Sequence, residues 1–243
     1  MALLEVQGLS KRFGGFVALE GIDLAVAEGE RVGLIGPNGS GKSTLVNCIC
    51  GTLVNETGTV HFDGAAVDGL LTHERTRRGM ARSFQLPRPF VTLTVAENLR
   101  VPLLYTVNAR PGRTLSPAAL DARCAELLQL VALADKAAQL PRDLTQVEMR
   151  KLELARAMAA EPKLLIADES MAGLSQSEVD DIVALLIRLN ERGITIVLIE
   201  HIMRAVMQFS QRLVVLVSGR KIADGAPDAV VRDPEVEKAY LGQ

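Results

Sequence analysis

Short apolar segments separated by turns dominate the first third of the chain. Residues Leu3–Gly8, Phe16–Ala25 and Arg31–Ile35 have the composition of β-strands, and Val60–Phe62 followed by Asp63-Gly64 is typical of a hairpin strand. Because the first three of these strands follow one another with only turns between them and the fourth leads into a hairpin turn, the pattern favours antiparallel pairing. We therefore predict an N-terminal antiparallel β lobe.

The middle of the chain has a helical pattern. No convincing strand is found between about Pro87 and Ala160, whereas Val95–Leu104 and Pro117–Leu133 repeat apolar residues at helical spacing. The loop Asn108–Gly112 separates these two segments. This part of the sequence predicts a helical lobe.

The last third alternates apolar strands with helices. Leu164–Ala167, Thr195–Ile199 and Leu213–Val217 are short, apolar and rich in β-formers, and Ser177–Asn190 is a helix between the first two. That alternation predicts a parallel sheet covered by helices. The predicted fold is a single α/β domain over residues 1–243, in which residues 1–86 hold the β lobe and the first part of the core, 87–160 the inserted helical lobe, and 161–243 the rest of the core.

Composition narrows the class of protein. The 243-residue chain is 48% hydrophobic and carries a formal net charge of −2, which argues against disorder and against bulk nucleic-acid binding. No apolar run reaches the roughly 18 residues of a membrane span, and the first residues lack the features of a signal peptide. An odd number of cysteines without a CxxC pair predicts free thiols (Cys48, Cys50, Cys124). We expect a cytoplasmic protein.

A phosphate-binding loop follows the strand Arg31–Ile35. The chain matches the whole pattern G-x-x-x-x-G-K-[ST] and continues as a predicted helix that ends at Gly51. Glycines let backbone N–H groups curve around phosphate oxygens, and the helix N-terminus adds partial positive charge. We therefore predict a nucleotide site in a P-loop (RecA-like) core, in which Lys42 reaches the β- and γ-phosphates and Ser43 binds Mg²⁺. Its residues are Gly36, Pro37, Asn38, Gly39, Ser40, Gly41, Lys42, Ser43 and Thr44.

A second candidate site lies where the strand Leu164–Ala167 ends in Asp168 and Glu169. Ligands collect at the carboxyl ends of parallel strands, and two adjacent carboxylates in a buried site are costly without a cation. We predict that Asp168 holds Mg²⁺, directly or through water, and that Glu169 faces the water that attacks the γ-phosphate. A solvated turn is the simpler alternative, but the phosphate loop in the same chain favours the site.

With these motifs in this order, the sequence resembles the ATP-binding subunits of ABC transporters over residues 4–242. The loop matches the Walker A motif and Asp168-Glu169 the Walker B motif with its catalytic glutamate. The resemblance implies a role for each of the remaining markers. Phe13 would stack on adenine with Ala18 flanking the ring, Gln85 would be the Q-loop glutamine that meets Mg²⁺ and links to the helical lobe, and His201 would be the switch histidine at the γ-phosphate.

Within the family the chain is most similar to branched-chain amino acid transport subunits; similar subunits serve urea uptake or lipopolysaccharide export. Four less specific stretches carry this resemblance. They are Lys11–Gly15, Leu93–Leu99, Met171–Leu174 and Val236–Gly242.

The chain departs from the family at the signature motif, Leu-Ser-Gly-Gly-Gln. The aligned residues are Leu144–Glu148, in which Thr145 keeps a hydroxyl, while Gln146 and Val147 replace both glycines. Thr145 and Glu148 form a T-x-x-E capping box, so we predict an intact helix whose N-terminus can face a phosphate. Close approach of the backbone is obstructed at Gln146 and Val147.

The resemblance implies a subunit that binds MgATP together with a second ATP-binding subunit, as a homodimer or a heterodimer. It also implies transmembrane permease subunits, an indirect connection to a substrate-binding protein, no nucleic acid, and a position on the inner face of the cell membrane. Two alternatives remain open. One is an ABC ATPase for another cargo or for a non-transport task, and the other is a P-loop kinase or GTPase.

Overall fold

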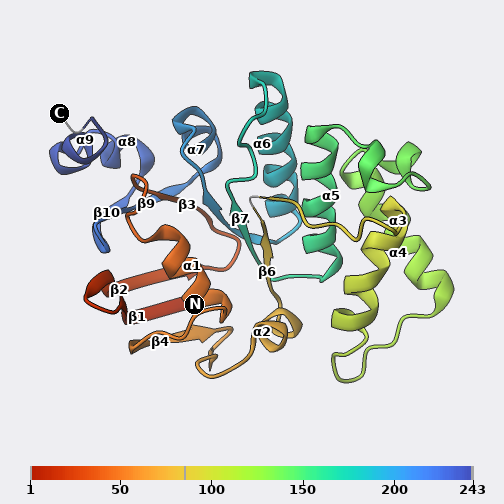
Figure 1. Cartoon of the computed structure of the whole chain (residues 1–243), viewed down its shortest axis with the longest axis horizontal. Helices are drawn as coiled ribbons and strands as arrows, with labels where there is room; N and C mark the ends of the chain where they lie inside the picture. The colour runs from red at the N-terminus through yellow and green to blue at the C-terminus, as the bar shows by residue number, and fades with distance from the viewer. Residues whose placement is uncertain (1, 85, 242–243) are drawn as a thin grey trace.

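The computed structural model describes residues 2–84 and 86–241 of the chain (Figure 1). The strands are β1 (Ala2–Phe13), β2 (Phe16–Ala27), β3 (Arg31–Ile35), β4 (Thr57–Phe62), β5 (Ala65–Ala66), β6 (Met80–Ser83), β7 (Leu164–Asp168), β8 (Thr195–Ile199), β9 (Arg212–Val217) and β10 (Arg220–Gly225). The α-helices are α1 (Lys42–Cys50), α2 (Thr72–Arg78), α3 (Val95–Pro102), α4 (Pro117–Leu130), α5 (Gln146–Ala159), α6 (Gln176–Glu191), α7 (Met203–Phe209), α8 (Pro227–Val230) and α9 (Pro234–Leu241). Shorter helical turns are η1 (Leu103–Val107), η2 (Ala134–Lys136) and η3 (Pro141–Asp143).

The larger sheet has the strand order β10-β9-β3-β8-β7-β6. Neighbours from β9 to β6 are parallel, and β10 runs antiparallel to β9. Parallel strands need crossover connections: α6 connects β7 to its neighbour β8, and α7 connects β8 to β9, on the other side of β3. The carboxyl ends of β3, β7 and β8 therefore lie at one edge of the sheet, which is where ligands gather in folds of this kind.

The core has two main layers, one on each face of this sheet. In β7, Leu164 and Ile166 pack with α1 and the smaller sheet, whereas Leu165 and Ala167 pack with α5 and α6. Because successive side chains of a strand point to opposite faces, a wholly apolar strand is the expected pattern for a sheet covered on both sides. Burial of these strands on both faces holds their carboxyl ends in fixed positions.

The smaller sheet is antiparallel, in the order β2-β1-β4-β5. The predicted hairpin is confirmed: Phe62 pairs with Ala65, and Asp63 and Gly64 both have positive φ, at 52° and 74°. The strand Arg31–Ile35 does not belong to this sheet, so grouping it with the antiparallel strands was wrong. It lies between β8 and β9 in the parallel sheet, and its continuous apolar run reflects burial on both faces.

The helical block consists of α3, η1, α4 and α5 and lies between β6 and β7 in the chain, at one end of the molecule (Figure 1). Thr94 caps α3 by accepting a hydrogen bond from the Glu97 backbone N–H at 3.2 Å. The helix ends at Pro102, earlier than predicted, and continues as the π-helical turn η1. The predicted helix Pro117–Leu133 ends at Leu130.

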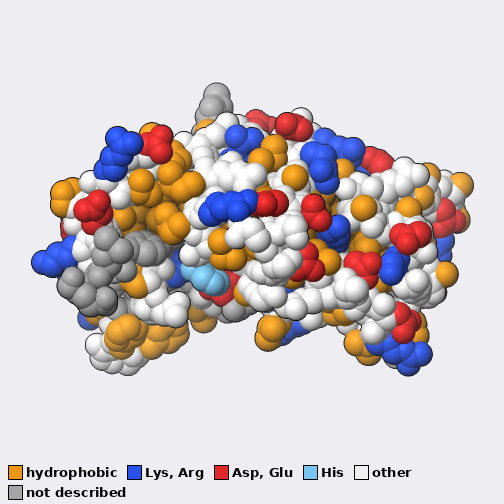
Figure 2. All heavy atoms as spheres, turned by 90° about the horizontal axis from the view of Figure 1, so that it is seen from above, with side chains coloured by type: hydrophobic (Ala, Val, Ile, Leu, Met, Phe, Trp, Pro, Cys, Tyr) orange, Lys and Arg blue, Asp and Glu red, His pale blue; other side chains and the backbone are white. Residues whose placement is uncertain are grey.

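The predicted α/β fold class with an antiparallel β lobe is confirmed, but two strands of the larger sheet were missed. The four residues of β6 include Arg82, which interrupts the apolar run, and β10 is an edge strand with exposed polar residues. Among the described residues, no helix is both long and apolar enough to cross a membrane. Seen from above, the molecule carries acidic and basic side chains interspersed rather than separated (Figure 2).

Candidate nucleotide site

The loop between β3 and α1 has a backbone that only glycine permits at two positions. Gly36 has a φ of 154°, and a Cβ atom there would lie 2.1 Å from the Leu216 carbonyl oxygen. Gly41 has a φ of 104°, and its Cβ would lie 2.7 Å from the Ala18 carbonyl oxygen. The loop is therefore packed tightly against neighbouring backbone, and α1 begins without a side-chain cap, leaving its first N–H groups for a ligand.

Lys42 lies within this loop and is largely buried. Its Nζ donates hydrogen bonds to the carbonyl oxygens of Gly36 at 2.7 Å and Pro37 at 3.0 Å. Burial lowers the pKa of Lys42, while the carboxylates of Glu169 and Asp168 act to raise it. The Lys42 side chain is therefore held beside the loop, close to both carboxylates that follow β7.

A pocket of about 250 Å³ joins the loop to the β lobe. Phe13 and Phe16, at the ends of the β1–β2 turn, form one wall, with Ala18 beside them. Both rings are exposed, Phe13 at 49% and Phe16 at 63%, so their faces are available to a flat ligand. The pocket also includes Glu169 and the loop residues Asn38, Gly39, Ser40, Gly41, Lys42, Ser43 and Thr44.

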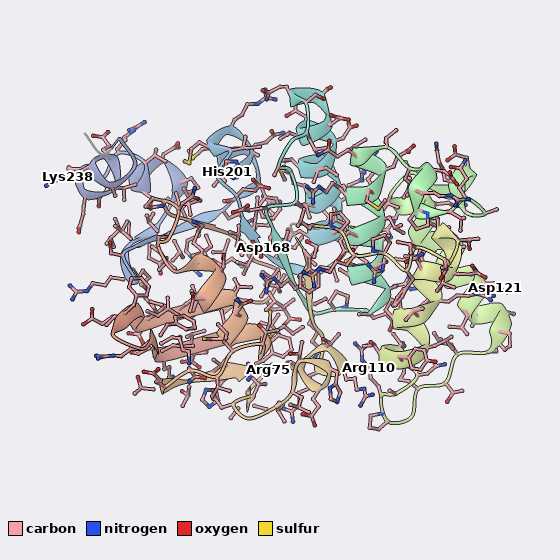
Figure 3. All side chains as sticks on the ribbon, viewed as in Figure 1. Arg75, Arg110, Asp121, Asp168, His201 and Lys238 are labelled. Carbon is pink, nitrogen blue, oxygen red and sulfur yellow. The ribbon has the colours of Figure 1, made fainter. Side chains whose placement is uncertain are left out.

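Two carboxylates follow one another at the end of β7, and their surroundings differ. Asp168 lies near the middle of the molecule (Figure 3) and is buried, and its Oδ2 accepts a hydrogen bond from Arg82 Nη2 at 2.5 Å. Glu169 faces the pocket and has a φ of 44°, a left-handed conformation that a non-glycine residue rarely adopts. Its backbone N–H donates to the Ile199 carbonyl oxygen at 2.9 Å, so pairing with β8 holds this turn. Backbone strain of this kind is concentrated at functional sites.

His201 follows β8 at the same edge of the sheet and is exposed. The residue before it, Glu200, is buried and accepts a hydrogen bond from the Met171 backbone N–H at 2.8 Å. Burial raises the pKa of Glu200. Its Oε2 lies 3.8 Å from Nδ1 of His201. The buried carboxylate thereby links the segment after β7 to the histidine.

Thr145 is the N-cap of α5, and the predicted capping box is confirmed. The Thr145 N–H donates to Glu148 Oε2 at 2.8 Å, and the Thr145 hydroxyl accepts from the Glu148 N–H at 3.4 Å. The neighbouring Gln146 donates from Nε2 to the Ala172 carbonyl oxygen at 3.4 Å. Thr145 does not line the pocket around the loop, so within one chain the structure does not bring it to that site.

The structure thus gathers most of the predicted residues at one place. Gln85 lies outside the described residues. Three contributors were missed: Phe16, Arg82 and Asn47, whose Oδ1 accepts from Arg82 Nη1 at 2.7 Å. Phe16 could have been found from its position opposite Phe13 across a Gly-Gly turn, whereas Arg82 could not, because its strand was not recognised.

The oxygen donors at this site suit a magnesium ion. The Ser43 hydroxyl and the Asp168 and Glu169 carboxylates are hard ligands of the type that Mg²⁺ prefers. No cluster of three or more His, Cys, Asp or Glu side chains that could hold a metal is present in the described part of the chain. An ion here would therefore depend on oxygens from phosphate and water in addition to these side chains.

A parallel sheet, a phosphate loop at a helix N-terminus and an aromatic wall beside it define a P-loop nucleotide-binding protein. The model of the ABC transporter family matches residues 19–172, and that of the branched-chain amino acid ATP-binding cassette transporter matches residues 220–243. The chain belongs to the ABC transporter family and is an ATPase of that class.

Curated relatives match over almost the whole chain. The high-affinity branched-chain amino acid transport ATP-binding protein BraF of Pseudomonas aeruginosa is 39% identical, covering 99% of this chain and 98% of the relative. LivG of Escherichia coli, with the same description, is 37% identical over 99% of this chain and 98% of the relative.

Solved structures agree in fold. The ADP conformation of an ATP-binding cassette of an ABC transporter has a TM-score of 0.89 and 30% identity, covering 100% of both chains. A dimeric post-hydrolysis state of another cassette, bound to ADP and Pi, has a TM-score of 0.81 and 27% identity, covering 92% of this chain and 98% of that one.

Proposed function

We propose that this chain hydrolyses MgATP to power the uptake of branched-chain or related amino acids, as a peripheral subunit on the inner face of the cell membrane. The observation that carries the proposal is the pocket that unites Phe13, the phosphate loop and Glu169. Similarity to branched-chain amino acid transport proteins along nearly the whole chain supports the choice of cargo. Urea or lipid is the alternative cargo.

The proposed chemistry relies on positioning and charge. Phe13 stacks on adenine with Ala18 beside it, and the loop N–H groups hold the phosphates. Lys42 exchanges its hydrogen bonds to loop carbonyl oxygens for phosphate oxygens. Glu169, turned into the pocket by its unusual backbone, orients the attacking water and accepts its proton, while His201 contacts the γ-phosphate.

A magnesium ion would add positive charge at the phosphates during the reaction. We assign its protein ligands to Ser43 and Asp168, with Gln85 as the third candidate. Ser43 lines the pocket, and Asp168 is close enough to Lys42 for its carboxylate to act to raise the pKa of that lysine. Each is an oxygen donor on a rigid element, the first turn of α1 or the end of β7.

The partner ATPase is proposed to be a different chain, giving two unequal nucleotide sites. Gln146 and Val147 replace the signature glycines, and the Gln146 side chain lies against the segment after β7, where its Nε2 would be 2.8 Å from a Cβ atom at Gly173. These side chains keep the α5 backbone from approaching a phosphate of the partner's site. A complete signature from the partner would serve the site built on Lys42 and Glu169.

The permease subunits are proposed to dock at a pocket of about 330 Å³ between the helical block and the core. Aromatic side chains (Phe84, Phe90, Tyr105) and three arginines (Arg75, Arg82, Arg156) line it, with Glu153. Phe84 and Tyr105 are exposed, at 41% and 72%. An apolar helix with an acidic end would complement this lining.

The test is to purify the chain alone and together with the ATPase and permease proteins encoded beside it, and to measure ATP hydrolysis. We expect low activity alone, higher activity with the second ATPase, and further stimulation in the full complex by substrate-binding protein loaded with leucine. Full activity alone, with two equivalent nucleotides per dimer, would refute the unequal pair. As a second check, the double variant Gln146→Gly and Val147→Gly should increase ATP-driven self-association.

A further inference from the structure

Arg82 connects the nucleotide site to the pocket between the lobes. Its Nη2 donates to Asp168 Oδ2 at 2.5 Å and its Nη1 to Asn47 Oδ1 at 2.7 Å. Asp168 ends β7, and Asn47 lies on α1, whose first turn holds Lys42 and Ser43. One guanidinium group therefore ties together the two elements that supply the candidate metal ligands.

The ion pair lies in a largely water-excluded place. The Arg82 side chain is 14% exposed and that of Asp168 is 9% exposed. Charge-assisted hydrogen bonds of this kind are short and strong, and removing one partner leaves a buried charge without compensation. The Nε atom of Arg82 is buried and has no acceptor among the described residues. This side chain is held by Asp168 and Asn47 rather than by solvent.

The same side chain forms part of the pocket wall on the other side. Arg82 lines the 330 Å³ pocket with Phe84 and Phe90, and its guanidinium carbon lies 5.3 Å from the centroid of the Phe84 ring. Arg75, on α2, lines the same pocket and is well separated from Asp168, which lies near the middle of the molecule (Figure 3). Phe84 therefore packs against the side chain that holds Asp168.

We propose that Arg82 is a positioning residue that holds the Asp168 carboxylate and competes with Mg²⁺ for it, so that the ATP-loaded site binds the ion less tightly than it would without this side chain. The proposal rests on the proposed role of Asp168 as a metal ligand. Two cations that bind the same carboxylate repel each other, so each lowers the affinity of the carboxylate for the other. Losing the Arg82 hydrogen bond should tighten ion binding and leave Asp168 less well oriented.

The experiment measures binding of Mn²⁺ by electron paramagnetic resonance, with a non-hydrolysable ATP analogue present, in the parent chain, Arg82→Gln and Arg82→Lys. We expect Arg82→Gln to bind Mn²⁺ about tenfold more tightly, the effect of one charge-assisted hydrogen bond. Arg82→Lys keeps the charge but loses the forked donors that reach both Asp168 and Asn47, so its Mn²⁺ affinity should lie between those of the parent and Arg82→Gln. Affinity for the analogue without a metal should not change, and circular dichroism melting shows that each variant is folded.

Asp168→Asn separates this inference from the proposed function. If Asp168→Asn leaves Mn²⁺ affinity unchanged, Asp168 is not a metal ligand and the proposed metal site fails. If Asp168→Asn weakens Mn²⁺ binding but Arg82→Gln leaves it unchanged or weakens it too, the metal site stands and competition by Arg82 is refuted. A folded Arg82→Lys variant that behaves like Arg82→Gln would also contradict the inference, since the retained charge should compete.

Discussion

Replacing Phe13 with alanine tests the proposed adenine site. Phe13 and Phe16 face each other in register across the β1–β2 turn, and both line the pocket beside the phosphate loop. Phe13 is 49% exposed, so truncating its side chain removes about half of the burial of a core phenylalanine, or roughly 1 kcal/mol of folding stability. The Lys11 ammonium group lies 5.5 Å from the ring centroid and adds at most about 1 kcal/mol.

The effect on nucleotide binding should be larger. A base stacked on an aromatic side chain contributes about 1–3 kcal/mol, which corresponds to a loss of roughly 5- to 150-fold in ATP affinity. Affinity for inorganic tripolyphosphate should change less than about twofold, because it lacks the base. Isothermal titration calorimetry with both ligands and Mg²⁺ measures the difference directly.

Phe16→Ala is the matched control, since it removes the same side chain from the same pocket. Because the resemblance places the stacking on Phe13, we expect Phe16→Ala to keep ATP affinity within about threefold of the parent. Equal losses for ATP and tripolyphosphate in Phe13→Ala would show that the ring does not contact adenine. A greater loss in Phe16→Ala than in Phe13→Ala would mean that the stacking residue had been assigned wrongly.

Three further substitutions examine the phosphates, the water and the loop. Lys42→Ala should weaken ATP binding about 10- to 100-fold by removing charged hydrogen bonds to phosphate, and unchanged affinity in calorimetry would contradict its role. Glu169→Gln should keep ATP affinity and lower hydrolysis by roughly 10²- to 10⁴-fold in a phosphate-release assay, and parental turnover would exclude it as the base. Gly36→Ala places a methyl group 2.1 Å from the Leu216 carbonyl oxygen, whereas at Gly39 a Cβ would meet nothing within 4 Å. Gly36→Ala should therefore lower the melting temperature by several degrees more than Gly39→Ala, each lost kcal/mol costing about 2–4 °C, and equal melting would mean the loop adapts.

The parts of the fold that sequence predicted well were those with a strong local signal. The strands β7 and β8 are short, wholly apolar runs and the helix α6 is a long amphipathic one, and the T-x-x-E pattern located the start of α5 correctly. The strand β6 was not predicted, because it has only four residues and one of them is the charged Arg82. Its place in the sheet depends on pairing with β7, which no local pattern encodes.

The candidate site likewise combines features that the sequence predicts with features that depend on tertiary contacts. The phosphate loop and the two carboxylates after β7 are contiguous motifs whose chemistry can be predicted from residue type and order. The pair between Arg82 and Asp168 joins residues far apart in the chain, and the left-handed backbone of Glu169 depends on its hydrogen bond to Ile199. Both arise from tertiary contacts, so sequence reasoning could not supply them.

We propose that ATP hydrolysis at this site drives transport of branched-chain amino acids. The direct measurement is uptake of radiolabelled leucine into proteoliposomes that contain this chain, the adjacent ATPase and the permease subunits, with substrate-binding protein outside and MgATP inside. We expect uptake that requires internal ATP, is inhibited by unlabelled isoleucine or valine, and is strongly reduced by Glu169→Gln. ATP-dependent uptake of urea or another cargo without leucine, or leucine uptake unaffected by Glu169→Gln, would contradict it.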